Sequence, residues 1–364
     1  MAHAVTLDVC REDPGREISD VLQKLTEGFA LYFPGEKEPP KISSVQFMGR
    51  RLSDIARVEL CLSRSYENIY VKLHKNPKAP LERVHQKARL EFDTLSYLYE
   101  KFRNVPGCSV ARPIAFFPEE MAVVTEEGEG ENLHQLIKRK AGLWCGGSDL
   151  ELLTRHCRAS GVWLRHFQEI TAQQRQEALP VSDLLGHVRT DLEECVAIGL
   201  PRADSIRLVT FCEDQLRRVE GRDFSVVGIH PDFQPDNVLV SPAGVTVMDF
   251  TSFQYGSIYN DVARFLASLD FLTKNPLYSR AKIQNLMAAF LRGYGWSQNE
   301  LSPALPVYLV RSMVRASRSV SSWSVPMPVK RLVERRATAF LSAWSRRIIS
   351  SGDGFVGTLT LPSP

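Results

Sequence analysis

The feature that most constrains the fold is a change in residue pattern near position 130 of this 364-residue chain. Before that point lie runs of β-branched and aromatic residues, two of which alternate with polar residues as half-buried strands do. Beyond it, apolar residues recur three and four positions apart, which is the spacing of amphipathic helices. The order therefore predicts an α+β chain, with a small β-rich lobe followed by a larger helical lobe.

The same patterns place the expected elements. Strands are expected at 42–48, 56–63, 68–74, 110–117, 121–127 and on both sides of a turn at Pro242-Ala243-Gly244, and a charged helix at 81–102. Further helices are expected at 18–31, 134–140, 150–170, 183–198, 203–218, 261–271, 281–293, 306–318 and 329–349, with a glycine-rich loop at 142–148.

These elements divide the chain into four parts. Residues 1–40 form an N-terminal extension that ends in a turn rich in Pro and Gly, and residues 41–127 form the β-rich lobe. Residues 128–300 form the helical lobe, and residues 301–364 form its basic helical continuation and a tail. No internal repeat or low-complexity tract interrupts this order.

Composition indicates an ordinary globular protein, with 44% hydrophobic and 24% charged residues. No apolar run reaches the roughly 20 residues of a membrane span, and the first residues lack a signal-peptide pattern. We therefore expect no transmembrane segment. The seven cysteines are scattered singly, and His156-Cys157 has no second ligand pair at zinc spacing. Buried or idle thiols in a reducing cytoplasm are the expected interpretation.

Charge is distributed unevenly along the chain. Between Leu301 and Ser350 there are nine basic residues and one acidic residue, although the net charge of the whole chain is only +3. Arg311, Arg315 and Arg318 share one helical face. Such a block favours an anionic partner or peripheral contact with a membrane surface, but many basic blocks are only a solvated helix face. We expect no nucleic-acid partner, and the sequence does not indicate an oligomeric state.

The most specific motif is His-Pro-Asp-Phe-Gln-Pro-Asp-Asn at 230–237, followed by Met-Asp-Phe at 248–250. A phosphoryl transfer to an alcohol needs a carboxylate to orient the attacking hydroxyl, and hard oxygen ligands for Mg²⁺. Asp232 fits the first role, and Asn237 with Asp249 fits the second. Taken singly, these residues also suit a helix cap, a turn and a solvated strand end. Together they are typical of a phosphoryl-transfer centre.

With this motif the chain resembles the aminoglycoside phosphotransferase-like (choline kinase-like) branch of the protein-kinase-like fold, over roughly residues 42–295. The resemblance implies transfer of the γ-phosphate of ATP, with Mg²⁺, to a hydroxyl of a sugar, an amino alcohol or a lipid headgroup. It also implies that residues 41–127 bind the nucleotide and that residues 128–300 carry catalysis.

By the same resemblance, Asp232 is the catalytic carboxylate, while Asn237 and Asp249 are the metal ligands. His230 is expected to brace the loop, and Asp261 to anchor it from a helix start, where helix capping is the alternative role. Gln234 stands where many relatives have a second His. Asp236 is a weaker alternative metal ligand or a simple loop charge.

The nucleotide contacts implied by the resemblance lie in the β-rich lobe. Lys72 stands on the third strand, where kinase-like enzymes place the lysine that contacts the phosphates. Lys75, after the strand, is the poorer alternative to Lys72. Glu91 is the expected helix partner of Lys72, and Glu82 and Asp93 stay open as alternatives to Glu91.

The phosphate-covering loop is the poorest match to the kinase pattern. Gly49 is its single glycine, and Ser53 or backbone amides near Gly49 are expected to touch phosphate. Gly128-Glu129-Gly130 fits a hinge between the lobes instead. There the backbone of Thr125, Glu126 and Glu127 is expected to meet the adenine.

Two other functions remain open. A catalytically inactive kinase-like binding module would have no chemical need for Lys72, Glu91, Asp232, Asn237 and Asp249. A protein kinase usually carries Arg where this chain has Pro231, and the chain has no Ala-Pro-Glu segment. For the acceptor, the family's cationic substrates call for acidic or aromatic pockets, whereas the arginine block points to an anionic one.

Overall fold

The computed structural model describes residues 14–49, 53–63, 65–144, 146–296, 302–323 and 325–351. Within these residues the chain forms two units. The first comprises the described residues up to Arg103, together with Val110–Gly128 and Asp249–Thr251, and the second comprises Asn104–Ser109, Glu129–Met248 and the described residues from Ser252 onward. The short segment 249–251 therefore belongs with the first unit although it follows most of the second in sequence.

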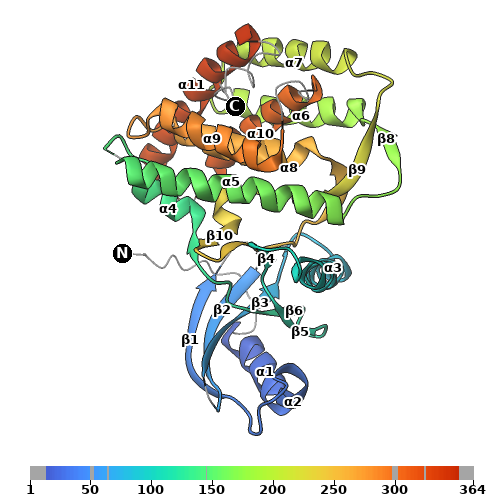
Figure 1. Cartoon of the computed structure of the whole chain (residues 1–364). Helices are drawn as coiled ribbons and strands as arrows, with labels where there is room; N and C mark the ends of the chain where they lie inside the picture. The colour runs from blue at the N-terminus through green and yellow to red at the C-terminus, as the bar shows by residue number, and fades with distance from the viewer. Residues whose placement is uncertain are drawn as a thin grey trace. The chain divides into compact units, whose positions relative to one another are not determined.

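A five-stranded antiparallel sheet forms the centre of the first unit (Figure 1). Its strands, in spatial order, are β1 (Lys41–Gly49), β2 (Ser53–Cys61), β3 (Tyr66–His74), β6 (Ala122–Glu126) and β5 (Pro113–Phe117). The helices of this unit are α1 (Pro14–Glu27), α2 (Phe29–Tyr32) and α3 (Leu81–Phe102). The β-rich lobe expected from the sequence is confirmed.

Alternation along β3 decides what each face of the sheet carries. Ile69, Val71 and Leu73 are buried in one apolar cluster together with Ile18 and Leu25 of α1. Successive side chains of a strand point to opposite faces, so the residues between them point away from that cluster. The segment expected to be an N-terminal extension thus supplies a helix to the core of this unit.

The second unit is mainly helical and carries two small sheets, confirming the expected helical lobe. One sheet has the order β4 (Cys108–Val110), β11 (Gly244–Val247), β10 (Val238–Ser241), β7 (Glu131–Asn132), and the other β12 (Gln254–Ser257), β9 (Asp223–Ile229), β8 (Gln176–Ala178). The helices are α4 (Leu133–Lys140), α5 (Gly147–Ile170), α6 (Val181–Ala197), α7 (Arg202–Arg217), α8 (Tyr259–Leu272), α9 (Arg280–Tyr294), α10 (Ala304–Ser319) and α11 (Met327–Ser351), with 3₁₀ turns η1 (Pro235–Asn237) and η3 (Val320–Ser322).

Three local differences from the sequence-based expectation have physical causes. The helix expected at 18–31 is two helices, because the chain turns at Gly28 between α1 and α2. The loop expected at 142–148 is shorter, because α5 begins at Gly147 and Lys140 pairs with Asp149 in its first turn at 2.5 Å. Strands β8 and β12 were not expected, since their short polar sequences carry no alternation and form by pairing with β9. The hairpin around Pro242-Ala243-Gly244 is confirmed.

Two findings bear on the composition-based expectations. No helix in the described part of the chain is long and apolar enough to cross a membrane. Cysteines 61, 108, 157, 195 and 212 are free thiols, and all but Cys61 are buried. Cys10 and Cys145 lie outside the described residues.

Close contact between α5 and α9, which run side by side in Figure 1, depends on glycine. A Cβ atom added to Gly161 would overlap the carbonyl oxygen of Phe290, and one added to Gly293 would overlap that of Arg158. Both obstacles are backbone atoms, which cannot move aside as a flexible side chain can. The two helices therefore tolerate no side chain at these positions without separating.

We predict that Gly161→Ala lowers the free energy of unfolding by about 1–3 kcal/mol through overpacking. The matched control is Gly186→Ala in α6, where an added Cβ meets nothing within 4 Å. Removing glycine from that exposed helix position should stabilise the protein by roughly 0.5–1 kcal/mol. Urea denaturation measures both variants, and an equal stabilisation in the two would contradict the packing described.

Candidate active site

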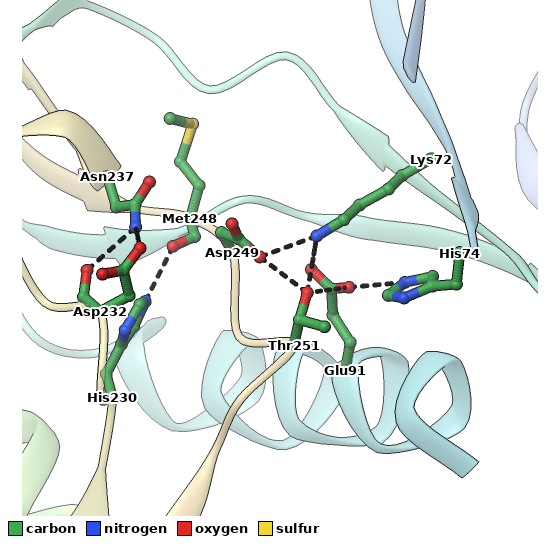
Figure 2. A network of polar contacts seen from close by, with 9 residues as sticks. All are labelled: Lys72, His74, Glu91, His230, Asp232, Asn237, Met248, Asp249 and Thr251. Atoms are coloured by element: carbon green, nitrogen blue, oxygen red, sulfur yellow. Dashed lines mark hydrogen bonds and ion pairs between the residues drawn. The ribbon is translucent and has the colours of Figure 1, made fainter. Parts of the chain in front are cut away.

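A cluster of charged side chains surrounds Lys72 in the first unit (Figure 2). The Lys72 ammonium donates hydrogen bonds to Glu91 Oε1 at 2.9 Å, to Asp249 Oδ1 at 2.8 Å and to Thr251 Oγ1 at 2.7 Å. The Thr251 hydroxyl also lies 2.9 Å from Glu91 Oε2 and 2.7 Å from Asp249 Oδ1. Its single hydrogen can go to only one of these carboxylates, so the cluster is held mainly by the ammonium.

Local periodicity explains why Lys72 and Glu91 meet. On β3, Lys72 lies between the buried Val71 and Leu73 and therefore points to the face opposite the α1 cluster. On α3, Glu91 is 3% exposed and falls on the same buried stripe as Ala88 and Leu95, three and four residues away. Strand alternation and helix spacing thus bring the two charges to one interface.

His74 is a further member of this cluster that sequence reasoning missed. It lies two residues beyond Lys72 on the same face of β3, and its Nε2 is 2.8 Å from Glu91 Oε2. Its spacing from Lys72 was the available signal. Thr251 was missed as well, and its signal was its position two residues after Asp249.

The cluster determines the charge states of its members. Burial alone would lower the pKa of Lys72, but the carboxylates of Glu91 and Asp249 outweigh it and leave that pKa raised. Burial would raise the pKa of Glu91, but the Lys72 ammonium and His74 outweigh it and leave that pKa lowered. Both groups are therefore charged at neutral pH.

The alternatives left open by the sequence have other partners. Lys75 pairs with Asp54 of β2. Glu82 accepts a hydrogen bond from Gln86 at 3.4 Å, and Asp93 pairs with Arg89 at 2.8 Å, one helical turn away on an exposed face. None of the three contacts Lys72 or Glu91 through these bonds.

Asp249 has a strained backbone. Its φ is +66°, and only Met121 shares a positive φ among the described non-glycine residues. Asp enters this left-handed region more readily than most residues but at an energetic cost. Lys72 and Thr251 both bond to the Asp249 carboxylate. These bonds offset the cost of the strained backbone and fix the direction of the side chain.

The second unit carries the other motif residues, on the loop between β9 and β10. Asn237 Nδ2 donates to the Asp232 carbonyl oxygen at 2.9 Å and lies 3.4 Å from Asp232 Oδ2. Asp232 Oδ1 accepts a hydrogen bond from Arg264 Nη2 of α8 at 2.7 Å. Asp232 keeps 42% of its side chain exposed, whereas Arg264 keeps 14%. Arg264 was not identified from the sequence, although it lies three residues after Asp261 on one helical face.

Buried groups hold this loop in place. The His230 N–H donates to Asp261 Oδ2 at 2.9 Å, and His230 Nε2 lies 2.9 Å from the Met248 carbonyl oxygen (Figure 2). Phe233 is fully buried and stacks on Trp163 with ring centroids 5.6 Å apart. His230 and Asp261 therefore bond to backbone, as bracing residues do, and neither contacts Asp232 through these bonds.

The segment expected to meet adenine is already engaged through its N–H groups. Glu126 N donates to the Arg112 carbonyl oxygen at 2.9 Å, and Glu127 N donates to that of Asn68 at 2.8 Å. The Glu127 carboxylate is held by Arg57 at 2.7 Å. An adenine contact here would therefore use other backbone groups of the segment than these two N–H groups.

The phosphate-covering loop falls partly outside the described residues, which omit 50–52. Gly49 ends β1 and pairs with Asp54, and an added Cβ there would meet nothing within 4 Å. Packing therefore does not require glycine at this position. Ser53 is buried at the start of β2.

The oxygen donors present suit a hard cation. In the described part of the chain, no three His, Cys, Asp or Glu side chains gather as a complete metal site. Asp249 offers a carboxylate with 46% of its side chain exposed. Asn237 turns its amide nitrogen to Asp232, which leaves its amide oxygen as the remaining donor. Carboxylate and amide oxygens fit Mg²⁺, which usually completes its shell with water and substrate phosphates.

Comparison with known proteins gives two kinds of similarity. The model of the family described as "APH: Phosphotransferase enzyme family" matches residues 69–306. No curated protein matches the chain significantly.

Solved structures match almost the whole chain. Choline kinase from Cryptosporidium parvum Iowa II has a TM-score of 0.57 at 15% identity, covering 94% of this chain and 99% of its own. An amicoumacin kinase in complex with AMP-PNP and Ca²⁺ has a TM-score of 0.53 at 13% identity, covering 90% and 96%. Aminoglycoside phosphotransferase from Alicyclobacillus acidocaldarius has a TM-score of 0.51 at 14% identity, covering 94% and 98%. These matches confirm the kinase-like fold.

We predict that Asp261 makes stability depend on pH. The residue is fully buried, and burial raises its pKa from 3.8 to about 6, against the opposing hydrogen bonds from Asn260 and His230. The folded protein thus binds this proton more tightly than the unfolded chain. Stability therefore falls as pH rises from about 4 to about 6, by up to about 3 kcal/mol.

Asp261→Asn tests this prediction, because the amide stays neutral at every pH and retains an oxygen for the His230 N–H. Urea denaturation of both proteins at pH 4, 5, 6 and 7 should show the wild type losing stability relative to the variant across that window. A constant offset introduced by the amide cancels from the comparison. Parallel pH profiles would show that Asp261 does not titrate there.

Proposed function

The chain belongs to the phosphotransferase enzyme family, and from this premise we propose that it transfers the γ-phosphate of ATP, with Mg²⁺, to a hydroxyl of a small molecule. The family makes it a phosphotransferase, and the fold it shares with choline kinase supports a small-molecule acceptor. The observation that carries the finer proposal is the Lys72 ammonium, bonded to Glu91 and Asp249. A buried, charged lysine beside an exposed carboxylate suits a triphosphate with its metal.

Each set of residues has a role in this proposal. Lys72 binds the phosphates, and Glu91 keeps the ammonium in position. Asp249 and Asn237 would hold Mg²⁺, which supplies charge neutralisation of the phosphates when bound. The chain passes from one unit to the other between Met248 and Asp249, and Met248 N donates to the Asn237 carbonyl oxygen at 3.1 Å. Met248, which precedes one proposed ligand, Asp249, in the chain, is thus hydrogen-bonded to the other, Asn237.

We assign Asp232 as the carboxylate that orients the acceptor. Arg264 bonds to Oδ1 at 2.7 Å, whereas Oδ2 has only the longer 3.4 Å contact with Asn237 Nδ2, so we assign Oδ2 to the proton of the attacking hydroxyl. In the transfer, a bond forms between the hydroxyl oxygen and the γ-phosphorus. The bond from that phosphorus to the β,γ-bridging oxygen breaks, and ADP leaves. The hydroxyl proton passes to Asp232 and then to water.

The remaining assignments are supporting ones. His230 and Asp261 hold the catalytic loop through the backbone bonds described above. The backbone of Thr125, Glu126 and Glu127 is assigned to the adenine, through groups other than the two N–H groups engaged in the sheet. We assign the backbone of Gly49 to the phosphates, because packing does not require a glycine at this position and close approach of a ligand to the backbone would.

We predict that Asp232→Asn lowers kcat by about 10²–10⁴-fold, which is the rate enhancement that a general base usually contributes. The amide keeps an oxygen acceptor for Arg264 but lacks basicity. Turnover is measured as Mg²⁺-dependent ADP release with pooled sugars, amino alcohols, sugar phosphates and lipid headgroups. Affinity for Mg·AMP-PNP, measured by calorimetry, should stay within about twofold of the wild type.

Asp236→Asn is the matched control, since Asp236 lies in the same loop with 48% of its side chain exposed. It should retain turnover. Normal turnover by Asp232→Asn would overturn the assignment of the base. A wild-type protein that neither releases ADP with any pool nor binds Mg·AMP-PNP would overturn the proposed function itself.

A further inference from the structure

We propose that the phosphate acceptor carries an anionic group, a phosphate or a carboxylate, and that Arg264, Arg311 and Arg315 recognise it beside Asp232. This inference rests on the proposed function, because it concerns the acceptor for the same catalytic carboxylate. It differs from the cationic acceptors expected by resemblance, and it depends on contacts within the second unit alone.

Two packed helices carry the arginines. Arg264 lies on α8, whereas Arg311 and Arg315 lie one turn apart on α10, which packs against α8. Arg264 reaches Asp232 Oδ1 through Nη2 at 2.7 Å. Its Nε is buried and has no hydrogen-bond partner within the described residues. Arg264 therefore bonds to the catalytic carboxylate through Nη2, while its buried Nε donates to no group of the described chain.

Electrostatics place Arg315 in the same neighbourhood. Its side chain reaches solvent, yet its pKa is lowered, first by partial burial and then by the positive charges of Arg264 and Arg311. The carboxylates of Asp232 and Asp191 oppose this lowering, and Asp191 is itself paired with Arg318. Arg315 is thus within electrostatic range of two further arginines, Arg264 and Arg311, and of the Asp232 and Asp191 carboxylates.

The next arginine of α10 shows how a cation on this helix is normally neutralised. Arg318 pairs with Asp191 at 3.0 Å and with Glu194 at 3.1 Å, both on α6. Neither Arg311 nor Arg315 forms an ion pair with any carboxylate of the described chain, and Asp232 already pairs with Arg264. The cluster therefore has an excess of positive charge, which costs stability unless an anion joins it.

The position of this excess charge identifies the ligand class. Arg264 bonds to the carboxylate that receives the acceptor's proton in the proposed reaction, so an anion bound here lies near the acceptor hydroxyl. Guanidinium groups match the two-oxygen edge of a phosphate or carboxylate. A cationic amino sugar or quaternary amine would instead be repelled by three guanidinium groups. A small hydroxylated acid or phosphate monoester fits the site.

The test uses inorganic sulfate as the probe for a bound dianion. Sulfate is titrated into the full-length protein at constant ionic strength, with and without saturating Mg·AMP-PNP, and binding is followed by calorimetry. The variant is Arg311→Gln with Arg315→Gln, which leaves Arg264 and Asp232 intact. The matched control is Arg336→Gln on α11, an exposed arginine with no ion pair to the described residues.

We expect the double variant to bind sulfate at least tenfold more weakly than the wild type, and the control to bind within about twofold. Sulfate should bind equally well with the nucleotide site filled, and both variants should bind Mg·AMP-PNP normally. Equal sulfate binding by the wild type and the double variant would overturn the proposal. Sulfate displaced by nucleotide would overturn it too, because the arginines would then serve the nucleotide phosphates.

Acceptor turnover gives an independent reading. Among matched compounds such as glycerol, glycerol 3-phosphate, glycerate and 3-amino-1,2-propanediol, and among the pools above, the best acceptor should be anionic. The double variant should raise its KM at least tenfold. A neutral or cationic best acceptor would overturn this inference while leaving the phosphotransferase itself established. Absence of Mg·AMP-PNP binding would instead count against the proposed function.

Discussion

A buried pair of opposite charges, Lys72 with Glu91, is the interaction on which the rest of this site depends. Removing two ions from water costs several kcal/mol each, and their mutual attraction offsets that cost only when further hydrogen bonds satisfy both groups. Here Asp249, Thr251 and His74 supply those bonds. The pair therefore holds β3, α3 and the segment 249–251 together, and gives this short segment its place in the first unit.

The same requirement connects several features that lie far apart in the sequence. Asp249 adopts a positive φ, and its carboxylate meets the Lys72 ammonium. On the other side of the same peptide bond, Met248 is hydrogen-bonded through its N–H to Asn237 and through its carbonyl oxygen to His230. Asp249 thus bonds to Lys72, while the residue before it bonds to the catalytic loop. In the proposed reaction, Asp249 and Asn237 would hold the metal, and Lys72 would bind the phosphates.

Much of this arrangement could be predicted from sequence, because it follows from short-range periodicity. Strand alternation places Lys72 on the face of the sheet opposite to that of Val71, and helix spacing buries Glu91. The spacing of the motif brings Asn237 to the backbone of Asp232. His74, Thr251 and Arg264 were not identified, although each lies two or three residues from an expected site residue, because their bonds to Glu91, Lys72 and Asp232 form only when distant segments pack. The same is true of α1, whose burial against β3 depends on tertiary contact. Whether Asp232, Asn237 and Asp249 perform their assigned roles stays a prediction.

The central claim is that the Lys72 cluster binds nucleotide phosphates, and calorimetric titration of Mg·AMP-PNP into Lys72→Met tests it most directly. Lys75→Met is the matched control, because it removes the same charge from a lysine that pairs with Asp54 instead. Circular dichroism verifies that both variants are folded. The account predicts at least tenfold weaker binding by Lys72→Met, about 1.4 kcal/mol or more, and wild-type affinity in the control. Wild-type affinity in a folded Lys72→Met protein would contradict it.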